Sequence, residues 1–357
     1  MTVLECEGRK RGAYFTADEL MKMHFPEPRW AVPGLIAEGL TLLGGAPKQG
    51  KSWLCLDLGI SVASGTPALG KIDVDTGDVL YAALEDPPRR LHSRLRKILG
   101  VSPAPTRLTL VTELPTFEVA LDNVAEWLEA HPAARLVIVD VLAKIRPQAP
   151  PGRNAYELDY AVLSKMKGLA DRYSVAVIVV THLRKMEASD VFDTVSGSTG
   201  LTGAADATIV LKRARGEGAA SLHVTGRDVV ENEYAVTFDP TTCTWSLDGA
   251  ELAEAAKRAR ASKVSTGLGD KSAEIVTLLA DHPEGLGPTQ VGKFTGMTPA
   301  NAGTYLTRLA DAGRLSKISR GRYTLVESVQ TVETGEADVL AFPHIPHIAQ
   351  GPEGEPS

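Results

Sequence analysis

Short apolar segments alternate with longer amphipathic stretches between residue 40 and residue 211. The apolar segments are four to six residues long, which suits buried strands, and they cover residues 40–43, 79–84, 108–111, 136–139, 175–180 and 208–211. Helices that bury one face are indicated at 54–63, 89–99, 119–130 and 161–172. This alternation predicts an α/β fold in which helices cover both faces of a mostly parallel sheet.

The pattern changes after residue 211. Three strand-like segments, 221–225, 234–238 and 243–247, follow one another without helices, which predicts antiparallel strands at one edge of the sheet. Further on, a charged and alanine-rich stretch indicates a partly helical linker, and an acidic end with scattered Pro and Gly indicates a disordered tail. The predicted divisions are a first domain at 1–248 with a lead-in at 1–38, a linker at 249–268, a second domain at 269–326 and the tail at 327–357.

The second domain has the pattern of three helices followed by a hairpin. An apolar helix is expected at 272–281 and a second one in PTQVGKF. The third begins with Thr298 as N-cap and Pro299 at its first position, and it stops before Gly313. The segments RLSKI and RYTLV then form the hairpin, so the domain resembles a winged helix-turn-helix. The outward-facing residues of the third helix are Asn301, Thr304 and Arg308.

The distribution of charge limits the classes of partner that this chain is expected to bind. The net charge is −6, from 38 basic and 44 acidic residues, and six acidic residues after Tyr323, with no Lys or Arg among them, supply all of the excess. A neutral body does not by itself indicate nucleic acid. Residues 288–326, however, contain six basic residues and one acidic residue, which favours duplex DNA as the partner of the winged helix. A winged helix that binds another protein is the alternative.

Composition excludes several classes of protein. Apolar residues make up 43% and charged residues 23%, as in ordinary folded domains. Three widely spaced cysteines exclude a disulfide scaffold and a zinc finger, and they favour a reducing cytoplasm. No apolar stretch approaches the roughly 20 residues that span a bilayer, and the first residues lack the apolar run of a secretion signal. We therefore expect a cytoplasmic protein with no membrane contact.

Residues 45–52 read GAPKQGKS, which satisfies the phosphate-loop pattern G-x-x-x-x-G-K-[ST] between an expected strand and an expected helix. The backbone N–H groups of such a loop cradle phosphate, and its glycines permit the turn. Lys51 would reach the β- and γ-phosphates of ATP, and the Ser52 hydroxyl would bind Mg²⁺. A glycine-rich turn without a ligand would leave both residues unexplained. The expected ATP-binding residues are Gly45, Ala46, Pro47, Lys48, Gln49, Gly50, Lys51, Ser52 and Trp53.

Three polar residues at the ends of other apolar strands are candidates for the same site. Asp140 follows 136–139 in the Walker B pattern, where the carboxylate holds Mg²⁺; a turn or cap residue is the alternative. Glu85 follows 79–84 and could activate the attacking water, or it could cap the next helix, a role that Asp86 also suits. His182 follows 175–180 and could sense the γ-phosphate, or it could be a surface histidine.

In this order, GAPKQGKS, VLYAALEDPPRRLHSRL, LVIVD, VAVIVVTHLRK and SGSTGLTGAADATIVLKR resemble the motifs of RecA/DnaB-type P-loop ATPases. The likeness is greatest to the RepA-like hexameric replicative helicases of plasmids and phages. The resemblance implies a RecA-like core, a homohexamer with ATP at its subunit interfaces, and single-stranded DNA inside the ring. It assigns Glu85 as the catalytic glutamate and His182 as the polar sensor. It also assigns Arg227, in LHVTGRDVVENE, as an arginine finger for the neighbouring subunit; DnaB-type proteins have a lysine where this chain has Thr225.

Two loops with basic residues are candidates for contact with single-stranded DNA. Residues 144–153 contain Lys144, Arg146 and Arg153, and residues 184–199 contain Arg184 and Lys185. Mobile surface loops are the alternative.

Together these features predict an ATP-hydrolysing DNA motor, a helicase or translocase, that acts in the replication of a plasmid, phage or mobile element. Its expected catalytic residues are Lys51, Glu85, Asp140, His182 and Arg227, with Ser52 and Asp140 as Mg²⁺ ligands. The alternative is a DNA-binding replication initiator or regulator in which ATP acts as an assembly switch.

Overall fold

A computed structural model describes residues 15–147, 155–183, 191–194, 203–214, 216–265 and 268–326. It divides the chain into two compact units, Met1–His282 and Pro283–Ser357. The tail predicted at 327–357 lies outside the described residues.

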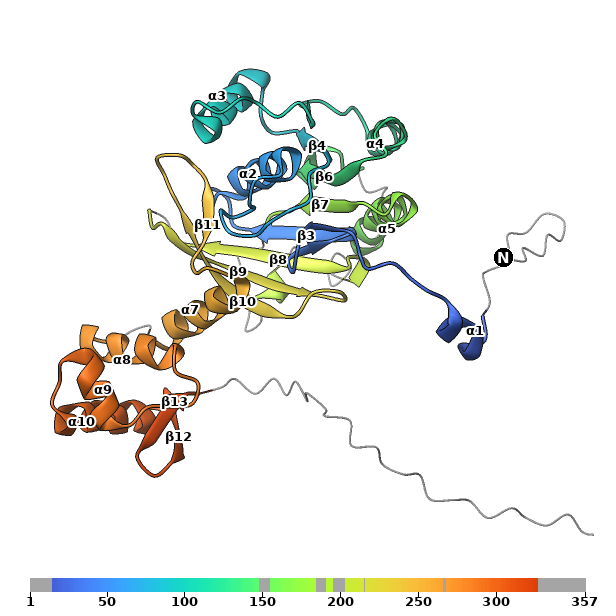
Figure 1. The fold of residues 1–357 in the computed structure, drawn as a ribbon. Helices are drawn as coiled ribbons and strands as arrows, with labels where there is room; N and C mark the ends of the chain where they lie inside the picture. Colours follow the sequence, from blue (N-terminus) through green and yellow to red (C-terminus); the bar gives the residue numbers. More distant parts are fainter. Residues whose placement is uncertain are drawn as a thin grey trace, which may run out of the picture. The chain divides into compact units, whose positions relative to one another are not determined.

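The first unit is built on a nine-stranded sheet, and Figure 1 shows helices on both of its faces. The strand order is β11-β10-β9-β8-β3-β7-β6-β4-β5. Six strands form the parallel part: β3 (Gly39–Gly45), β4 (Asp78–Ala83), β5 (Leu108–Val111), β6 (Ala134–Asp140), β7 (Ala176–Val180) and β8 (Ala207–Arg213). The antiparallel edge consists of β9 (Ala219–Gly226), β10 (Asn232–Phe238) and β11 (Trp245–Leu247). The predicted α/β, RecA-like class and the antiparallel edge are both confirmed.

Alternate side chains of the parallel strands enter two separate cores. On β6, Leu136 and Ile138 belong to one buried cluster, together with residues of α2 (Lys51–Ser64) and α3 (Pro88–Leu99). Val137 and Val139 belong to the other, together with residues of α4 (Phe117–Ala130) and α5 (Ala155–Tyr173). Because successive side chains of a strand point to opposite faces, a strand covered on both sides has to be apolar throughout. This explains the uninterrupted apolar segments of the sequence.

The ends of the first unit are more structured than the sequence predicts. The lead-in contains α1 (Ala17–Lys22) and a hairpin of β1 (Trp30–Val32) and β2 (Ile36–Ala37). The stretch predicted as a partly helical linker forms α7 (Leu252–Ser265), which buries Ala255 and Ala256 in the core beside β10. Small alanines let a helix approach a sheet closely, and a composition rich in alanine does not distinguish such a helix from a linker. A further helix, α8 (Asp270–Ala280), ends the unit.

The second unit contains α9 (Pro288–Thr295), α10 (Pro299–Asp311) and a hairpin of β12 (Leu315–Ser319) and β13 (Arg322–Leu325). The Thr298 side chain accepts a hydrogen bond from the Asn301 N–H, as an N-cap does. Gly313 follows α10 with φ of +69°. The buried residues of α10 are Ala302, Leu306 and Leu309. None of the helices that the structure describes is long and apolar enough to cross a membrane.

Candidate nucleotide-binding site

The loop Gly45–Ser52 connects the end of β3 to the start of α2, so the first turn of α2 opens directly onto it. Gly50 is the N-cap of α2 and has φ of +104°. A Cβ atom at Gly50 would stand 2.8 Å from Cζ2 of Trp245, so close packing and backbone conformation both require glycine here. The exposed N–H groups at this helix start provide the anion cradle that the sequence predicts.

Two residues that sequence reasoning missed, Arg213 and Trp245, contact the loop and the helix that follows it. The Gln49 amide accepts a hydrogen bond from the Ala46 N–H (2.8 Å) and donates one to the carbonyl oxygen of Arg213 (3.1 Å). The Arg213 guanidinium lies 4.2 Å from the ring centroid of Phe238. Trp245, on β11, donates its backbone N–H to the Asp57 carboxylate of α2 at 2.8 Å. No local signal could indicate Arg213 or Trp245, because both are far from the loop in sequence.

Lys51 is buried at the base of the loop. Its ammonium donates to the carbonyl oxygens of Gly45 (2.6 Å) and Ala46 (3.2 Å), and it lies 3.5 Å from Nδ1 of His182. Burial lowers the pKa of Lys51, and the nearby carboxylates of Asp140 and Glu85 oppose that shift. The structure therefore brings a buried cation, the strand-end histidine and the loop together.

Asp140 ends β6 and is 4% exposed. Tyr81, a residue that the sequence analysis did not single out, donates its hydroxyl to Oδ2 of Asp140 at 2.9 Å, and Ser52 makes a second side-chain hydrogen bond to this carboxylate. Burial raises the pKa of Asp140 above its usual value, and the hydrogen bonds from Ser52 and Tyr81 offset only part of this rise. A serine hydroxyl beside a carboxylate is the oxygen donor set that suits Mg²⁺, so these residues fit the predicted metal site.

The two acidic residues after β4 have different surroundings. Glu85 is exposed in the turn, and its charge acts on both Lys51 and Asp140. Asp86 is buried and forms ion pairs with Arg90 (3.2 Å) and Arg94 of α3. The Arg94 guanidinium also lies 5.1 Å from the ring centroid of Trp53, which follows Ser52. Asp86 thus anchors the turn to α3, and Glu85 stays exposed within electrostatic range of Lys51 and Asp140.

Arg227 does not join this group of residues. It follows β9, at the end where Gly226 pairs with Ala207 at the start of β8. The P-loop lies at the opposite end of β8, where Leu211 pairs with Gly45. Among the candidate DNA contacts, the Arg146 guanidinium pairs with Asp159 at 2.6 Å, and Lys144 is exposed. Arg153, Arg184 and Lys185 lie outside the described residues.

The fold and this arrangement define a P-loop ATPase: a RecA-like sheet, a strand–glycine loop–helix element with Lys51 and Ser52, and an aspartate at the end of a nearby strand. A family model described as "AAA domain" matches residues 9–188, about half of the chain, and the chain therefore belongs to this family. Nucleotide binding follows from membership of this class.

Several solved structures are similar to this chain. One solved ATPase domain is similar with a TM-score of 0.50 and 13% identity, over 59% of this chain and 85% of that one. A DnaB-like replicative helicase, solved to show its interactions with primase, has a TM-score of 0.48 and 14% identity over 58% and 57%. The KaiC-like protein PH0186 from Pyrococcus horikoshii OT3 has a TM-score of 0.45 and 14% identity over 61% and 94%. At these identities the likeness concerns the fold alone.

Proposed function

We propose that this protein is an ATP-driven motor that acts on DNA, a helicase or translocase of the RepA-like kind. The observation that carries the proposal is the convergence of Lys51, Ser52 and Asp140, with Glu85 and His182 close by, at the carboxyl ends of the parallel strands. In open α/β sheets, ligands bind at this edge.

Each residue of the site has a proposed role. Lys51 and the N–H groups of the loop hold the triphosphate, and Ser52 and Asp140 hold the Mg²⁺ that screens its charge. Glu85, exposed beside them, takes a proton from the attacking water. His182 lies close enough to Lys51 to respond when the γ-phosphate leaves, and residues 184–199, a candidate DNA contact, follow it in the sequence.

The proposed assembly is a homohexamer in which Arg227 completes the site of a neighbouring subunit. Its guanidinium is 65% exposed and stands at the sheet end remote from its own P-loop. This position suits a finger that acts between subunits, because the side chain is exposed and remote from the P-loop of its own chain. A fixed positive charge there would stabilise the transition state.

The C-terminal unit is proposed as a winged helix that binds duplex DNA. Asn301, Thr304 and Arg308 lie on the exposed face of α10, as expected from the sequence. Thr304 and Arg308 also line an open groove of about 460 Å³ between α9, α10 and β13. Lys317, Arg320 and Arg322 are exposed on the hairpin, where they can contact phosphates.

ATP hydrolysis, measured with and without single-stranded DNA, tests the ATPase and its coupling to DNA. Lys51→Ala should abolish hydrolysis, and Glu85→Gln should retain nucleotide binding while turnover stops. Arg227→Ala should leave nucleotide binding intact and lose assembly-dependent turnover. Turnover that is unaffected by Glu85→Gln would contradict the role of Glu85, and light scattering gives the oligomeric mass.

Strand displacement on a forked duplex separates the motor from the alternative, an initiator or regulator that ATP switches between assembly states. A motor unwinds the fork only when ATP is hydrolysed. Tight binding to duplex DNA with no displacement and no stimulation by single strands would favour the switch. The basic hairpin and the acidic tail are the features that keep this alternative open.

A further inference from the structure

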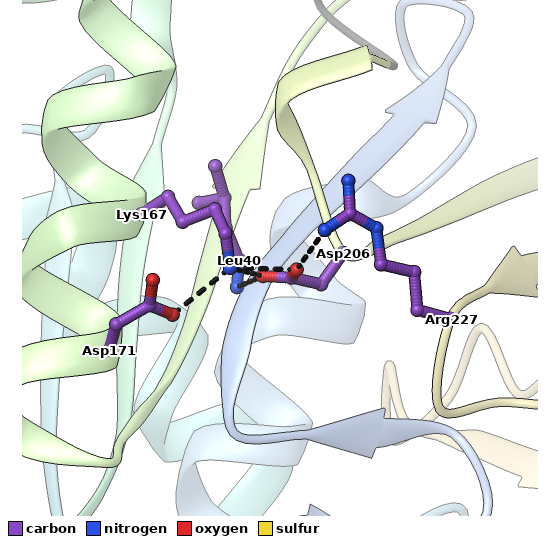
Figure 2. Close-up of polar contacts among 5 residues, drawn as sticks. All are labelled: Leu40, Lys167, Asp171, Asp206 and Arg227. Atoms are coloured by element: carbon purple, nitrogen blue, oxygen red, sulfur yellow. Dashed lines mark hydrogen bonds and ion pairs between the residues drawn. The ribbon is translucent and has the colours of Figure 1, made fainter. Parts of the chain in front are cut away.

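A largely buried carboxylate connects Arg227 to the strand that leads into the P-loop. Asp206 immediately precedes β8, and its side chain is 13% exposed. Figure 2 shows this carboxylate between Leu40 of β3, Lys167 of α5 and Arg227 after β9. It accepts the Leu40 N–H at 2.9 Å and the Lys167 ammonium at 2.7 Å, and it lies 3.6 Å from the Arg227 guanidinium.

Backbone hydrogen bonds also hold Asp206 and Arg227 together. The Asp206 N–H donates to the Leu40 carbonyl oxygen (2.8 Å), and the Arg227 N–H donates to the Asp206 carbonyl oxygen (2.9 Å). A Cβ atom at Gly226 would stand 2.8 Å from that same oxygen and 2.6 Å from Cγ2 of Val229. Glycine at this position therefore lets the end of β9 lie directly on Asp206.

The side chain of Lys167 keeps the carboxylate in one orientation. Burial lowers the pKa of Lys167, but its hydrogen bonds to Asp206 and Asp171 outweigh burial and raise it overall, so the ammonium stays charged. Lys167 is 27% exposed and Arg227 is 65% exposed, so one partner of the carboxylate is fixed and the other projects outward. On the side of Arg227 there is a cavity of about 310 Å³, which Asp206, Thr208 and Thr225 also line.

We propose that Asp206 is a positioning residue for Arg227. Its carboxylate sets where the Arg227 guanidinium stands before that guanidinium enters the nucleotide site of a second copy of this chain. The inference rests on the proposed function, since it requires Arg227 to act between subunits. A free arginine side chain samples many rotamers and loses that freedom on docking. Holding it in advance against a fixed carboxylate reduces this entropic cost at the interface.

The first variant is Asp206→Asn, which keeps an oxygen for the Leu40 N–H and removes the charge that attracts Arg227. Turnover by the assembled protein should fall about tenfold, the usual effect of losing one charge-assisted contact. Nucleotide affinity should stay within about twofold, because the P-loop is unchanged. The matched control is Asp171→Asn, which removes the other carboxylate on Lys167 without touching Arg227 and should leave turnover unchanged.

Mixed assemblies distinguish positioning from a purely structural effect. Lys51→Ala subunits have an inactive nucleotide site but an intact Asp206 and Arg227. They can therefore supply Arg227 to the nucleotide site of an Asp206→Asn neighbour. We expect turnover per intact nucleotide site to rise back towards the wild-type value when the two variants are co-assembled and purified through two affinity tags. It should stay about tenfold lower when the donor also carries Arg227→Ala. Failure of the Lys51→Ala donor to restore turnover would show that Asp206 supports its own P-loop through Leu40, and would overturn the proposal.

Gly226→Ala is a second variant, which displaces Arg227 by crowding and leaves every charge in place. It should show the same loss and the same recovery, so the proposal stays testable if Asp206→Asn does not fold. Undiminished turnover in both variants would also overturn it. Arg227→Ala tests the proposed function separately. If this variant retains full turnover, Arg227 does not act between subunits, whatever the variants at Asp206 and Gly226 do.

Discussion

Asp57 offers a sharp test of the electrostatics around the P-loop helix. Its carboxylate, on α2, is partly buried and accepts the backbone N–H of Trp245 at 2.8 Å. Burial raises its pKa from 3.8 to about 6, and the hydrogen bond from Trp245 only partly opposes the shift. The folded protein therefore favours the neutral acid, and the stability that protonation provides is lost as the pH rises from 3.8 towards and beyond 6.

The size of this effect follows from the shift. A change from 3.8 to about 6 is about two pKa units, and at about 1.4 kcal/mol per unit the charged form destabilises the folded state by at most about 3 kcal/mol. Asparagine keeps the acceptor oxygen and carries no charge. Asp57→Asn should therefore be more stable than the wild type, by up to about 3 kcal/mol at pH 8 and about half as much at pH 5.

Urea unfolding of the full chain, followed by circular dichroism at both pH values, measures this difference. Asp122→Asn, on the exposed side of α4, is the control and should change stability little at either pH. The informative quantity is the growth of the Asp57→Asn advantage between pH 5 and pH 8, because a pH-independent change in packing cancels. An advantage that is equal at the two pH values, or one that shrinks as pH rises, would refute the reasoning.

Three further predictions concern the loop, the carboxylate at the end of β6 and the C-terminal unit. Gly50→Ala should abolish nucleotide binding measured by calorimetry, since its Cβ would meet Trp245 at 2.8 Å; wild-type affinity would contradict the account of the loop. Tyr81→Phe removes the 2.9 Å hydrogen bond to Asp140 and should raise the Mg²⁺ concentration for half-maximal hydrolysis several-fold, on the order of the 1 kcal/mol that one such bond is worth. Leu306→Ala empties a fully buried position and should cost about 2–5 kcal/mol, so that duplex binding is lost while ATP hydrolysis without DNA persists. Loss of both activities would show that the C-terminal unit is needed for the ATPase.

Much of the fold could be predicted because the signals are local. A strand buried on both faces needs consecutive apolar residues, and a helix on a sheet needs an apolar stripe, so periodicity located β3 to β8 and the helices between them. The phosphate loop could also be predicted, since its glycines, Lys51 and Ser52 act within a few residues of one another. The burial of the alanine-rich helix α7 could not be predicted, because it depends on the contact with β10 and not on the composition of the helix.

The sequence by itself determined the class of this protein: an α/β sheet, a phosphate loop, and acidic residues at the ends of strands. Only the tertiary structure decided which residues surround the loop and which carboxylate holds Arg227. The contacts Gln49–Arg213, Asp57–Trp245 and Leu40–Asp206 join residues 164, 188 and 166 positions apart. Such contacts depend on the order of strands in the sheet. That order is set by packing between segments that are far apart in the sequence, and the periodic pattern within one segment does not specify it.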